Sequence, residues 1–278
     1  MKKIAFIGAG NMASAIAGGI ISSKIVCPSD IILFDKNSLQ YTKFDSKCFY
    51  ASSIYEAVSL ADYIFLSVKP QNINDVLNEI KDHPNTSDKV FISICAGITI
   101  SSVEAKLGSV KIARAMPNTP LLIGQGTTGL CRNSLLNDNE FEFVYSFFSS
   151  SGYVATVEEN DINNVTALTG SAPAYVYLFI KSIVDGAKKL GFDNEHATKM
   201  VCNTLIGSAN MVLNSDKEID ELIKMVTSPN GTTEKALNRF NDNNFCEIVY
   251  DAMKACADRA EELSKLNWGN KNESKEEI

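Results

Sequence analysis

The chain has 278 residues, of which 45% are hydrophobic, with a formal net charge of −7 at pH 7 and a pI near 5.0, so it can bury one or two sizeable cores. This acidic balance, without clusters of Lys and Arg, argues against nucleic acid as a partner. No stretch approaches a membrane span, and Lys2 and Lys3 lead into a strand pattern rather than a signal peptide, so we expect a cytoplasmic protein without membrane contact.

The first predicted elements are a strand, a glycine turn and a helix. Lys3–Ile7 is a short apolar strand pattern that leads directly into the sequence GAGNMA, after which apolar residues recur at helical spacing. In this GxGxxA pattern Gly8 permits a tight turn, Gly10 lets the backbone approach a pyrophosphate, and Ala13 lets helix and strand pack closely. The pattern predicts a dinucleotide-binding loop, and the alternative is a glycine turn without a ligand.

Strands and helices then alternate along the first half of the chain. Apolar runs predict strands at Ile31–Phe34, Tyr63–Val68, Val90–Ile94, Lys111–Ala115, Thr127–Leu130 and Tyr153–Val157. Helical patterns lie at 54–60, 73–80, 101–107 and Glu140–Phe148. This alternation is typical of an α/β fold with a doubly wound parallel sheet.

In such a sheet the ligand lies at the carboxyl ends of the strands. The residues at two of these ends are Ser67, Val68, Lys69, Pro70 and Gln71 after one strand and Ala96 and Gly97 after the next. Lys69 is either a catalytic acid or a residue that lines the cofactor, and its position beside Pro70 favours lining. Asp35 ends the second strand, where an acid bonds the ribose hydroxyls of the cofactor and favours NADH. Lys36 offsets the repulsion between Asp35 and the 2′-phosphate of NADPH. The cofactor preference therefore stays open.

The second half of the chain is predicted to be helical. The polar segment Glu158–Asn164 is interpreted as a hinge, and no strand pattern follows it. Ser171 and Pro173 suit a helix start and Gly191 suits the position after its end. Further helical patterns lie at Asp193–Val212, Lys217–Val226, Thr233–Phe240 and Phe245–Leu266, and Asn267–Ile278 is expected to fray. The helix before Gly191 has a broad apolar face, which predicts burial against a partner subunit.

A second anion site is predicted between two of these helices. The residues Ser228–Thr233 have the sequence SPNGTT, which places hydroxyls and successive N–H groups at a helix N-terminus. This arrangement fits a small carboxylate, and the alternative is an ordinary capped turn between helices. Seven scattered cysteines without a CxxC pair, and only two histidines, suggest neither a disulfide framework nor a metal site.

Several separated segments resemble one enzyme family. They are GAGNMA at Gly8–Ala13, VKPQ at Val68–Gln71, CAG at Cys95–Gly97, ARAMPNTP at Ala113–Pro120, TGSAPAYVYLFI at Thr169–Ile180 and SPNGTT at Ser228–Thr233. Together they resemble pyrroline-5-carboxylate reductase, the enzyme of the last step of proline synthesis, over nearly the whole chain. The resemblance implies an N-terminal Rossmann domain over 1–160 and a helical substrate-binding and dimerisation domain over 161–278. It also implies an intertwined homodimer, with a decamer as a larger form.

The resemblance further implies that the substrate is 1-pyrroline-5-carboxylate and that NADPH or NADH, or both, donate the hydride. The residues carried over or nominated for the cofactor are Ile7, Gly8, Ala9, Gly10, Asn11, Met12, Asp35, Lys36, Ser53, Ser67, Val68, Lys69, Pro70, Ala96 and Gly97. Those for the substrate are Ser228, Asn230, Gly231, Thr232 and Thr233, of which Thr233 is the catalytic residue that meets the ring nitrogen.

Two positions depart from the family pattern. Asn230 stands where the family usually has the first of two glycines, and Asn tolerates a left-handed backbone better than most residues. Ser52 or Ser53 stands where an Asn often contacts the ribose, which puts that contact in doubt.

Two other interpretations of the sequence are open. A β-hydroxyacid dehydrogenase-like reductase would place a catalytic lysine in the central helix, but here the first lysine there is Lys181, well inside the helix, and the entry Thr169–Pro173 has no charged acid or base. A non-enzymatic dinucleotide sensor would be favoured by an eroded substrate loop. Ser228, Gly231 and both threonines are present, which argues against the sensor.

Overall fold

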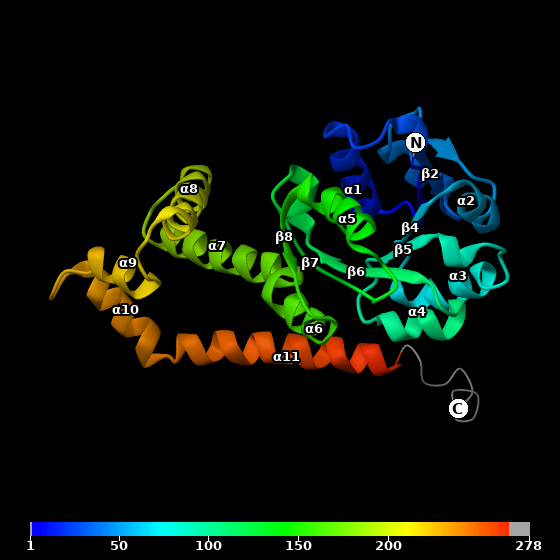
Figure 1. The fold of residues 1–278 in the computed structure, drawn as a ribbon. Coiled ribbons are helices and arrows are strands. Elements are labelled where there is room, and N and C mark those ends of the chain that lie inside the picture. The colour runs from blue at the N-terminus through cyan, green and yellow to red at the C-terminus, as the bar shows by residue number, and fades with distance from the viewer. Residues whose placement is uncertain (1, 267–278) are drawn as a thin grey trace, which may run out of the picture. The chain divides into compact units, whose positions relative to one another are not determined.

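The computed structural model describes residues 2–266, so the fraying predicted for Asn267–Ile278 lies outside the described residues. The chain divides into two compact units. The first is formed by Met1–Ser171 and Cys256–Ile278, and the second by Ala172–Ala255. Figure 1 shows the fold coloured along the chain.

An eight-stranded sheet forms the centre of the first unit. Its strands are β1 (Ile4–Ile7), β2 (Ile31–Phe34), β3 (Phe49–Tyr50), β4 (Tyr63–Leu66), β5 (Val90–Ser93), β6 (Lys111–Pro117), β7 (Gly126–Arg132) and β8 (Gly152–Thr156). Their order is β3-β2-β1-β4-β5-β6-β7-β8. All neighbouring pairs are parallel except β6 and β7, and β8 is parallel to β7. The reversal at β7 and the two-residue strand β3 are additions to the predicted sheet.

Helices cover both faces of this sheet (Figure 1). They are α1 (Asn11–Ser22), α2 (Ile54–Leu60), α3 (Ile73–Ile80), α4 (Ile100–Leu107) and α5 (Asp138–Ser149). One hydrophobic cluster joins α1 and α5 to side chains such as Phe6 and Phe65, and a second joins α2, α3 and α4 to side chains such as Ile7 and Ile64. Each fully buried side chain of this size contributes about 1.5–3 kcal/mol. This arrangement confirms the predicted doubly wound α/β fold.

The segment predicted as a hinge is instead packed against the sheet. It contains the 3-10 helix Glu159–Asp161, α6 (Ile162–Val165) and the π-helical turn Thr166–Gly170. Ile162 is 1% exposed within the second cluster, and the side chain of Val165 fills the space beside Gly129 of β7. These two apolar side chains anchor the segment to the sheet, and the second compact unit begins at Ala172.

The second unit is helical throughout. Its helices are α7 (Ala172–Lys189), α8 (Asn194–Asn214), α9 (Ile219–Met225), α10 (Thr232–Asp242) and the first part of α11 (Phe245–Leu266). No strand occurs among the residues described after β8, which agrees with the predicted helical half. Gly191 has a φ of +89°, the left-handed conformation predicted for the residue that follows α7.

Most apolar side chains of the second unit are exposed in a single chain. Within 172–255, all of which the structure describes, only two hydrophobic residues are buried, Val184 and Ala197. Leu190, Leu213 and Val226 are 81%, 80% and 68% exposed. Exposed apolar side chains in this number are typical of a protein interface.

One segment passes a length and composition test for a membrane span. Glu159–Lys189 is a continuous helical stretch of 31 residues with a mean hydropathy of 1.2. No such stretch was predicted from the sequence, in which the predicted hinge divides this region, but α6 and the π-helical turn continue the helical stretch into α7. One helix of this kind is weak evidence for a membrane, since core and interface helices share its composition.

Candidate cofactor and substrate sites

The turn between β1 and α1 brings two strand ends together at Gly8. Its φ is +101°, and its N–H donates to the carbonyl oxygen of Phe34 at 2.8 Å. A Cβ atom at this position would lie 2.7 Å from the carbonyl oxygen of Ser67. Gly8 is therefore required both by its backbone conformation and by the close approach of the chain after β4.

The N-terminus of α1 is open to an anion. Gly10 is its N-cap, without a side-chain cap and without an acidic residue in the first turn. The first N–H groups of a helix have no acceptor within the helix, and they carry the positive end of the helix dipole. A Cβ atom at Gly10 would meet nothing within 4 Å, so the space before these N–H groups is free. This geometry fits a phosphate group of a dinucleotide.

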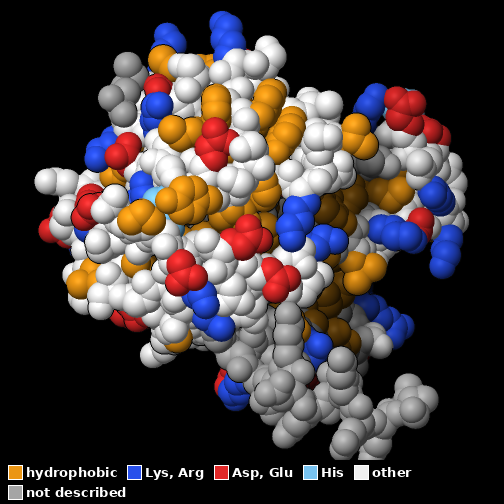
Figure 2. Space-filling model, turned by 90° about the vertical axis from the view of Figure 1, so that its right-hand side faces the viewer, with side chains coloured by type: hydrophobic (Ala, Val, Ile, Leu, Met, Phe, Trp, Pro, Cys, Tyr) orange, Lys and Arg blue, Asp and Glu red, His pale blue; other side chains and the backbone are white. Residues whose placement is uncertain are grey.

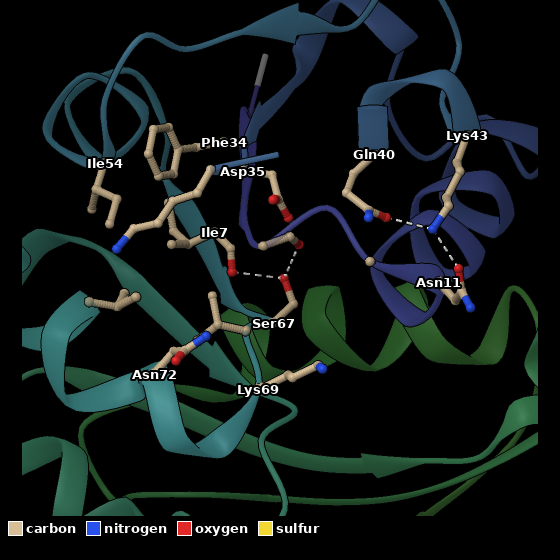
Figure 3. Close-up of a pocket in the computed structure, with 15 residues that line it drawn as sticks. Ile7, Asn11, Phe34, Asp35, Gln40, Lys43, Ile54, Ser67, Lys69 and Asn72 are labelled. Carbon is tan, nitrogen blue, oxygen red and sulfur yellow. Dashed lines mark hydrogen bonds between the residues drawn. The ribbon is translucent and has the colours of Figure 1, made fainter. Parts of the chain in front are cut away.

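A cavity of about 490 Å³ lies in front of this turn (Figure 3). Its lining includes nine of the residues predicted for the cofactor, namely Ile7, Gly8, Gly10, Asn11, Asp35, Lys36, Ser67, Val68 and Lys69. It also includes six that the sequence analysis missed, namely Phe34, Gln40, Lys43, Ile54, Asn72 and Val76. Phe34 and Ile54 supply an apolar wall, which suits the face of a nucleotide base.

Six residues predicted for the cofactor lie outside the lining of this cavity, namely Ala9, Met12, Ser53, Pro70, Ala96 and Gly97. Ser53 is the N-cap of α2, where its hydroxyl accepts the N–H of Glu56 at 3.1 Å. Pro70 starts the 3-10 helix Pro70–Asn72, and Gly97 follows β5 with a φ of +73°. The structure thus gives Ser53 a capping role that sequence reasoning did not consider.

The carboxylate of Asp35 is held by backbone N–H groups on both sides. Its Oδ2 accepts the N–H of Ala9 at 2.8 Å, and its Oδ1 accepts the N–H of Asn37 at 2.8 Å. Asp35 therefore ties the glycine turn to the end of β2. A carboxylate has further lone pairs, so it can still accept a ribose hydroxyl.

The half-buried side chain of Ser67 and the buried side chain of Cys95 fix the loop after β4. The Ser67 hydroxyl lies 3.1 Å from the carbonyl oxygen of Ile7 and 2.6 Å from that of Gly8 (Figure 3). The Cys95 thiol lies 3.3 Å from the carbonyl oxygen of Leu66 and 3.2 Å from that of Val68, and burial raises the pKa of this thiol to about 12. A thiol with this pKa stays protonated and acts as a donor. The loop that carries Lys69 is thus held from both sides.

The second unit contains the predicted substrate turn. Gly231 is the N-cap of α10, and its N–H donates to the carbonyl oxygen of Ser228 at 2.9 Å. A Cβ atom at Gly231 would lie 2.3 Å from the Ser228 hydroxyl, so a side chain there would displace Ser228. Asn230 has a φ of +58°, and its N–H donates to Glu234 Oε2 at 2.8 Å. The departure from the family glycine thus keeps the left-handed backbone.

The hydroxyls in this turn are free to bind a ligand. Thr232 and Thr233 begin α10, and neither hydroxyl has a hydrogen-bond partner among the described residues. They lie beside first-turn N–H groups that lack intrahelical acceptors. A small carboxylate would satisfy both kinds of donor.

A second cavity of the first unit, of about 480 Å³, lies beside the N-terminus of α4 and is polar, but its buried charge is already paired. Arg114 Nη1 lies 3.1 Å from Glu159 Oε1, and Glu159 also accepts the N–H of Ile100 at 2.6 Å. No group of three or more His, Cys, Asp or Glu side chains that could hold a metal ion occurs within residues 2–266.

Known proteins resemble the chain along nearly all of its length. Sequence models of two families match it: pyrroline-5-carboxylate reductase dimerisation at residues 159–263, and NADP oxidoreductase, coenzyme F420-dependent, at residues 3–97. The pyrroline-5-carboxylate reductase of Escherichia coli K12 is 38% identical over 269 residues, which cover 95% of this chain and 99% of that protein.

Solved structures agree with these relatives. The pyrroline carboxylate reductase of Plasmodium falciparum, solved with NADP bound, matches with a TM-score of 0.87 and 34% identity over 95% of this chain and 98% of its own. The pyrroline-5-carboxylate reductase of Coxiella burnetii matches with a TM-score of 0.87 and 33% identity, covering 94% of this chain and 98% of its own. The chain therefore belongs to the pyrroline-5-carboxylate reductase family.

Proposed function

We propose that the protein reduces 1-pyrroline-5-carboxylate to L-proline, the last step of proline biosynthesis, with NADPH or NADH as the reductant. The observation that carries this proposal is the presence of two open anion sites in a chain that is 38% identical to a named reductase over 95% of its length. One is the uncapped N-terminus of α1, and the other is the turn Ser228–Thr233 before α10. A bound nicotinamide cofactor supplies the hydride.

The residues of the first unit bind and orient the cofactor in this proposal. The turn Gly8–Met12 holds the pyrophosphate through its N–H groups. The loop Val68–Pro70 and the residues Ala96 and Gly97 lie at the carboxyl ends of β4 and β5, where the family places the nicotinamide. The hydrogen bonds of Ser67 and Cys95 keep this loop in place, which favours a fixed ring position.

The residues of the second unit bind the substrate. The substrate carboxylate is held by the hydroxyls of Ser228 and Thr232, by the N–H groups that follow Asn230, and by Gly231. The hydroxyl of Thr233 hydrogen-bonds to the ring nitrogen. The hydride adds to the imine carbon, the C=N double bond becomes a single bond, and the nitrogen gains a proton. That proton comes from solvent directly or through the Thr233 hydroxyl.

The second unit also supports assembly. The dimerisation model of the family covers residues 159–263, and the exposed apolar side chains of α7 and α8 give it a large surface to bury. We propose an intertwined homodimer, with a decamer as a larger assembly, located in the cytoplasm. In this proposal the apolar stretch Glu159–Lys189 packs against a second copy rather than against lipid.

The test is turnover by Thr233 variants. Purified protein would be mixed with 1-pyrroline-5-carboxylate and either NADPH or NADH, and cofactor oxidation and proline formation would be followed together. We expect Thr233→Ala to lower kcat/KM by about 100-fold and Thr233→Ser, which keeps a hydroxyl, to retain most of it.

Full kcat/KM in the alanine variant would contradict the role of Thr233. Cofactor binding by the wild-type protein without turnover of this substrate would contradict the reductase and favour the sensor interpretation.

A further inference from the structure

The turn before α10 is closed by a charged side chain that the sequence motif does not include. Asn230 has a left-handed backbone with a φ of +58°, and its N–H donates to Glu234 Oε2 at 2.8 Å. Glu234 lies in the first turn of α10 and has no other hydrogen bond or ion pair with a described residue. A carboxylate oxygen is a stronger acceptor than a neutral oxygen. The charge of Glu234 is therefore directed at the main chain of Asn230.

This contact differs from an ordinary capping box. In a capping box the acid in the first turn accepts the N–H of the N-cap residue. Here the N-cap is Gly231, whose N–H donates to the carbonyl oxygen of Ser228 at 2.9 Å, and Glu234 reaches one residue further back. The N–H groups of Thr232 and Thr233 come next, and neither has an acceptor among the described residues. The turn thus engages its first two N–H groups internally and leaves the following two open.

The identity of residue 230 explains why this chain needs the contact. A left-handed backbone costs more free energy for Asn than for Gly, which the family usually has at this position. The side chain of Asn230 is exposed and makes no hydrogen bond with any residue that the structure describes, so it does not stabilise its own backbone through an Asx turn. The hydrogen bond to Glu234 is the contact that offsets this cost.

We propose that Glu234 is a positioning residue for the substrate: it fixes Asn230 and thereby aims the N–H groups that follow at the substrate carboxylate. This rests on the proposed function, which assigns that carboxylate to the turn. Glu234 acts through Asn230 and does not touch the substrate. A carboxylate keeps its charge throughout the reaction, so its binding stabilises the ground state and the transition state alike. Loss of Glu234 should therefore raise KM for the substrate and leave kcat nearly unchanged.

The first measurement does not need the reaction. Hydrogen–deuterium exchange of the main-chain amides in 228–233 would be followed by mass spectrometry in ligand-free protein. We expect Glu234→Ala to speed this exchange by about tenfold and Glu234→Gln, which keeps an acceptor oxygen, by less than about threefold. Glu247→Ala is the matched control, because Glu247 is an exposed acid in the first turn of α11 in the same unit, and it should change nothing.

The second measurement separates KM from kcat with the same variants. Glu234→Ala should raise KM for 1-pyrroline-5-carboxylate by about tenfold, change kcat by less than about threefold and leave KM for NADPH unchanged. Glu234→Gln should restore most of the loss, because the hydrogen bond and not the charge alone holds the turn. A general loss of folding would instead move both KM values or lower the amount of active enzyme.

A double-mutant cycle tests whether Glu234 acts through Asn230. In the Asn230→Gly background, where the left-handed backbone carries little cost, Glu234→Ala should raise KM by less than about threefold. An equal loss in both backgrounds, or unchanged exchange in Glu234→Ala, would overturn the proposal. If the exchange pattern holds but the wild type does not reduce 1-pyrroline-5-carboxylate, the proposed reaction fails and the role of Glu234 in fixing the turn stands.

Discussion

The two units of the chain differ in where their apolar side chains lie. In the first unit, large side chains such as Phe6, Phe65 and Phe147 are fully buried between sheet and helices. In the second unit only Val184 and Ala197 are buried, although its helices are rich in Leu, Ile and Met. The first unit is thus stabilised by its own core, whereas the second has too little core in one chain and must gain stability by association.

The largest expected effect is on that association. Val176 on α7 is 48% exposed and Leu135 in the first unit is 47% exposed, so they form a matched pair. Val176→Asp should weaken self-association by about a thousandfold, because an unpaired charge buried at an interface costs several kcal/mol, whereas Leu135→Asp should leave it unchanged. Light scattering after size-exclusion chromatography measures the mass, and equal behaviour of the two variants would contradict the distinction between the units.

The next effect separates two glycines of the first unit. Gly8→Ala should lower the free energy of unfolding by about 2–4 kcal/mol, because φ is +101° and the new Cβ would lie 2.7 Å from a backbone oxygen. Gly10→Ala should change it by less than about 1 kcal/mol, since its Cβ meets no atom, yet weaken NADPH binding at least about tenfold by filling the phosphate approach. Urea unfolding and calorimetry would measure the two quantities, and a stable Gly8→Ala protein would contradict the assignment.

A third prediction concerns the boundary between the units. Glu159→Gln should lower the free energy of unfolding of the first unit by about 3 kcal/mol, because it leaves the 97% buried Arg114 without its charged partner. Glu158→Gln, an exposed neighbour, is the control and should change it by less than about 0.5 kcal/mol. If urea unfolding shows no difference between the variants, the segment 159–171 is not anchored to the sheet as described.

The prediction with the smallest expected effect on the fold concerns the chemical labelling of two thiols. Cys27 is exposed, while Cys95 is buried and burial raises its pKa to about 12. Because the thiolate is the nucleophile, native protein at pH 8 should react with iodoacetamide at Cys27 and not at Cys95. Mass spectrometry of digested protein measures the two sites, and rapid labelling of Cys95 would show that the loop after β4 opens readily.

Local sequence patterns were sufficient for much of the fold. The strand, glycine turn and helix at Lys3–Ala13 were predicted because hydrophobic period and glycine spacing are local properties. The strand β3 was missed because Phe49 and Tyr50 form only two residues and both are exposed, which leaves no pattern to detect. The prediction of a hinge at Glu158–Asn164 was wrong, because this polar segment contains one apolar side chain, Ile162, that anchors it to the sheet.

The site was predicted where the glycine motif and the carboxyl ends of the predicted strands form it. Gly8, Gly10 and Asn11 line the cavity because they belong to the turn. Lys43 and Gln40 lie in a polar segment without periodicity, and the fold of the chain after β2 brings them to Asn11. The lysines that follow Asp35 in the sequence were a signal for a basic site. Their spacing alone could not show which of them lines the cavity and which, like Lys47, does not.

On the face drawn in Figure 2, side chains of both charge signs are interspersed among hydrophobic ones. The lining of the cofactor cavity has three lysines, Lys36, Lys43 and Lys69, and one aspartate, Asp35. Attraction of an anionic cofactor is therefore concentrated at its binding cavity.

The reversal of β7 also offers a site for protein engineering. Because β7 is antiparallel to β6, its carboxyl end lies at the edge of the sheet opposite to the ends of β1, β4 and β5 that hold the cavity. The turn that follows exposes Ser134 and Leu135, while the side chain of Asn133 anchors its start by accepting the N–H of Ile112 at 3.1 Å. A fluorescent reporter inserted between these two exposed residues would thus be attached to a rigid sheet. It would lie far from the cofactor cavity whose state it reports.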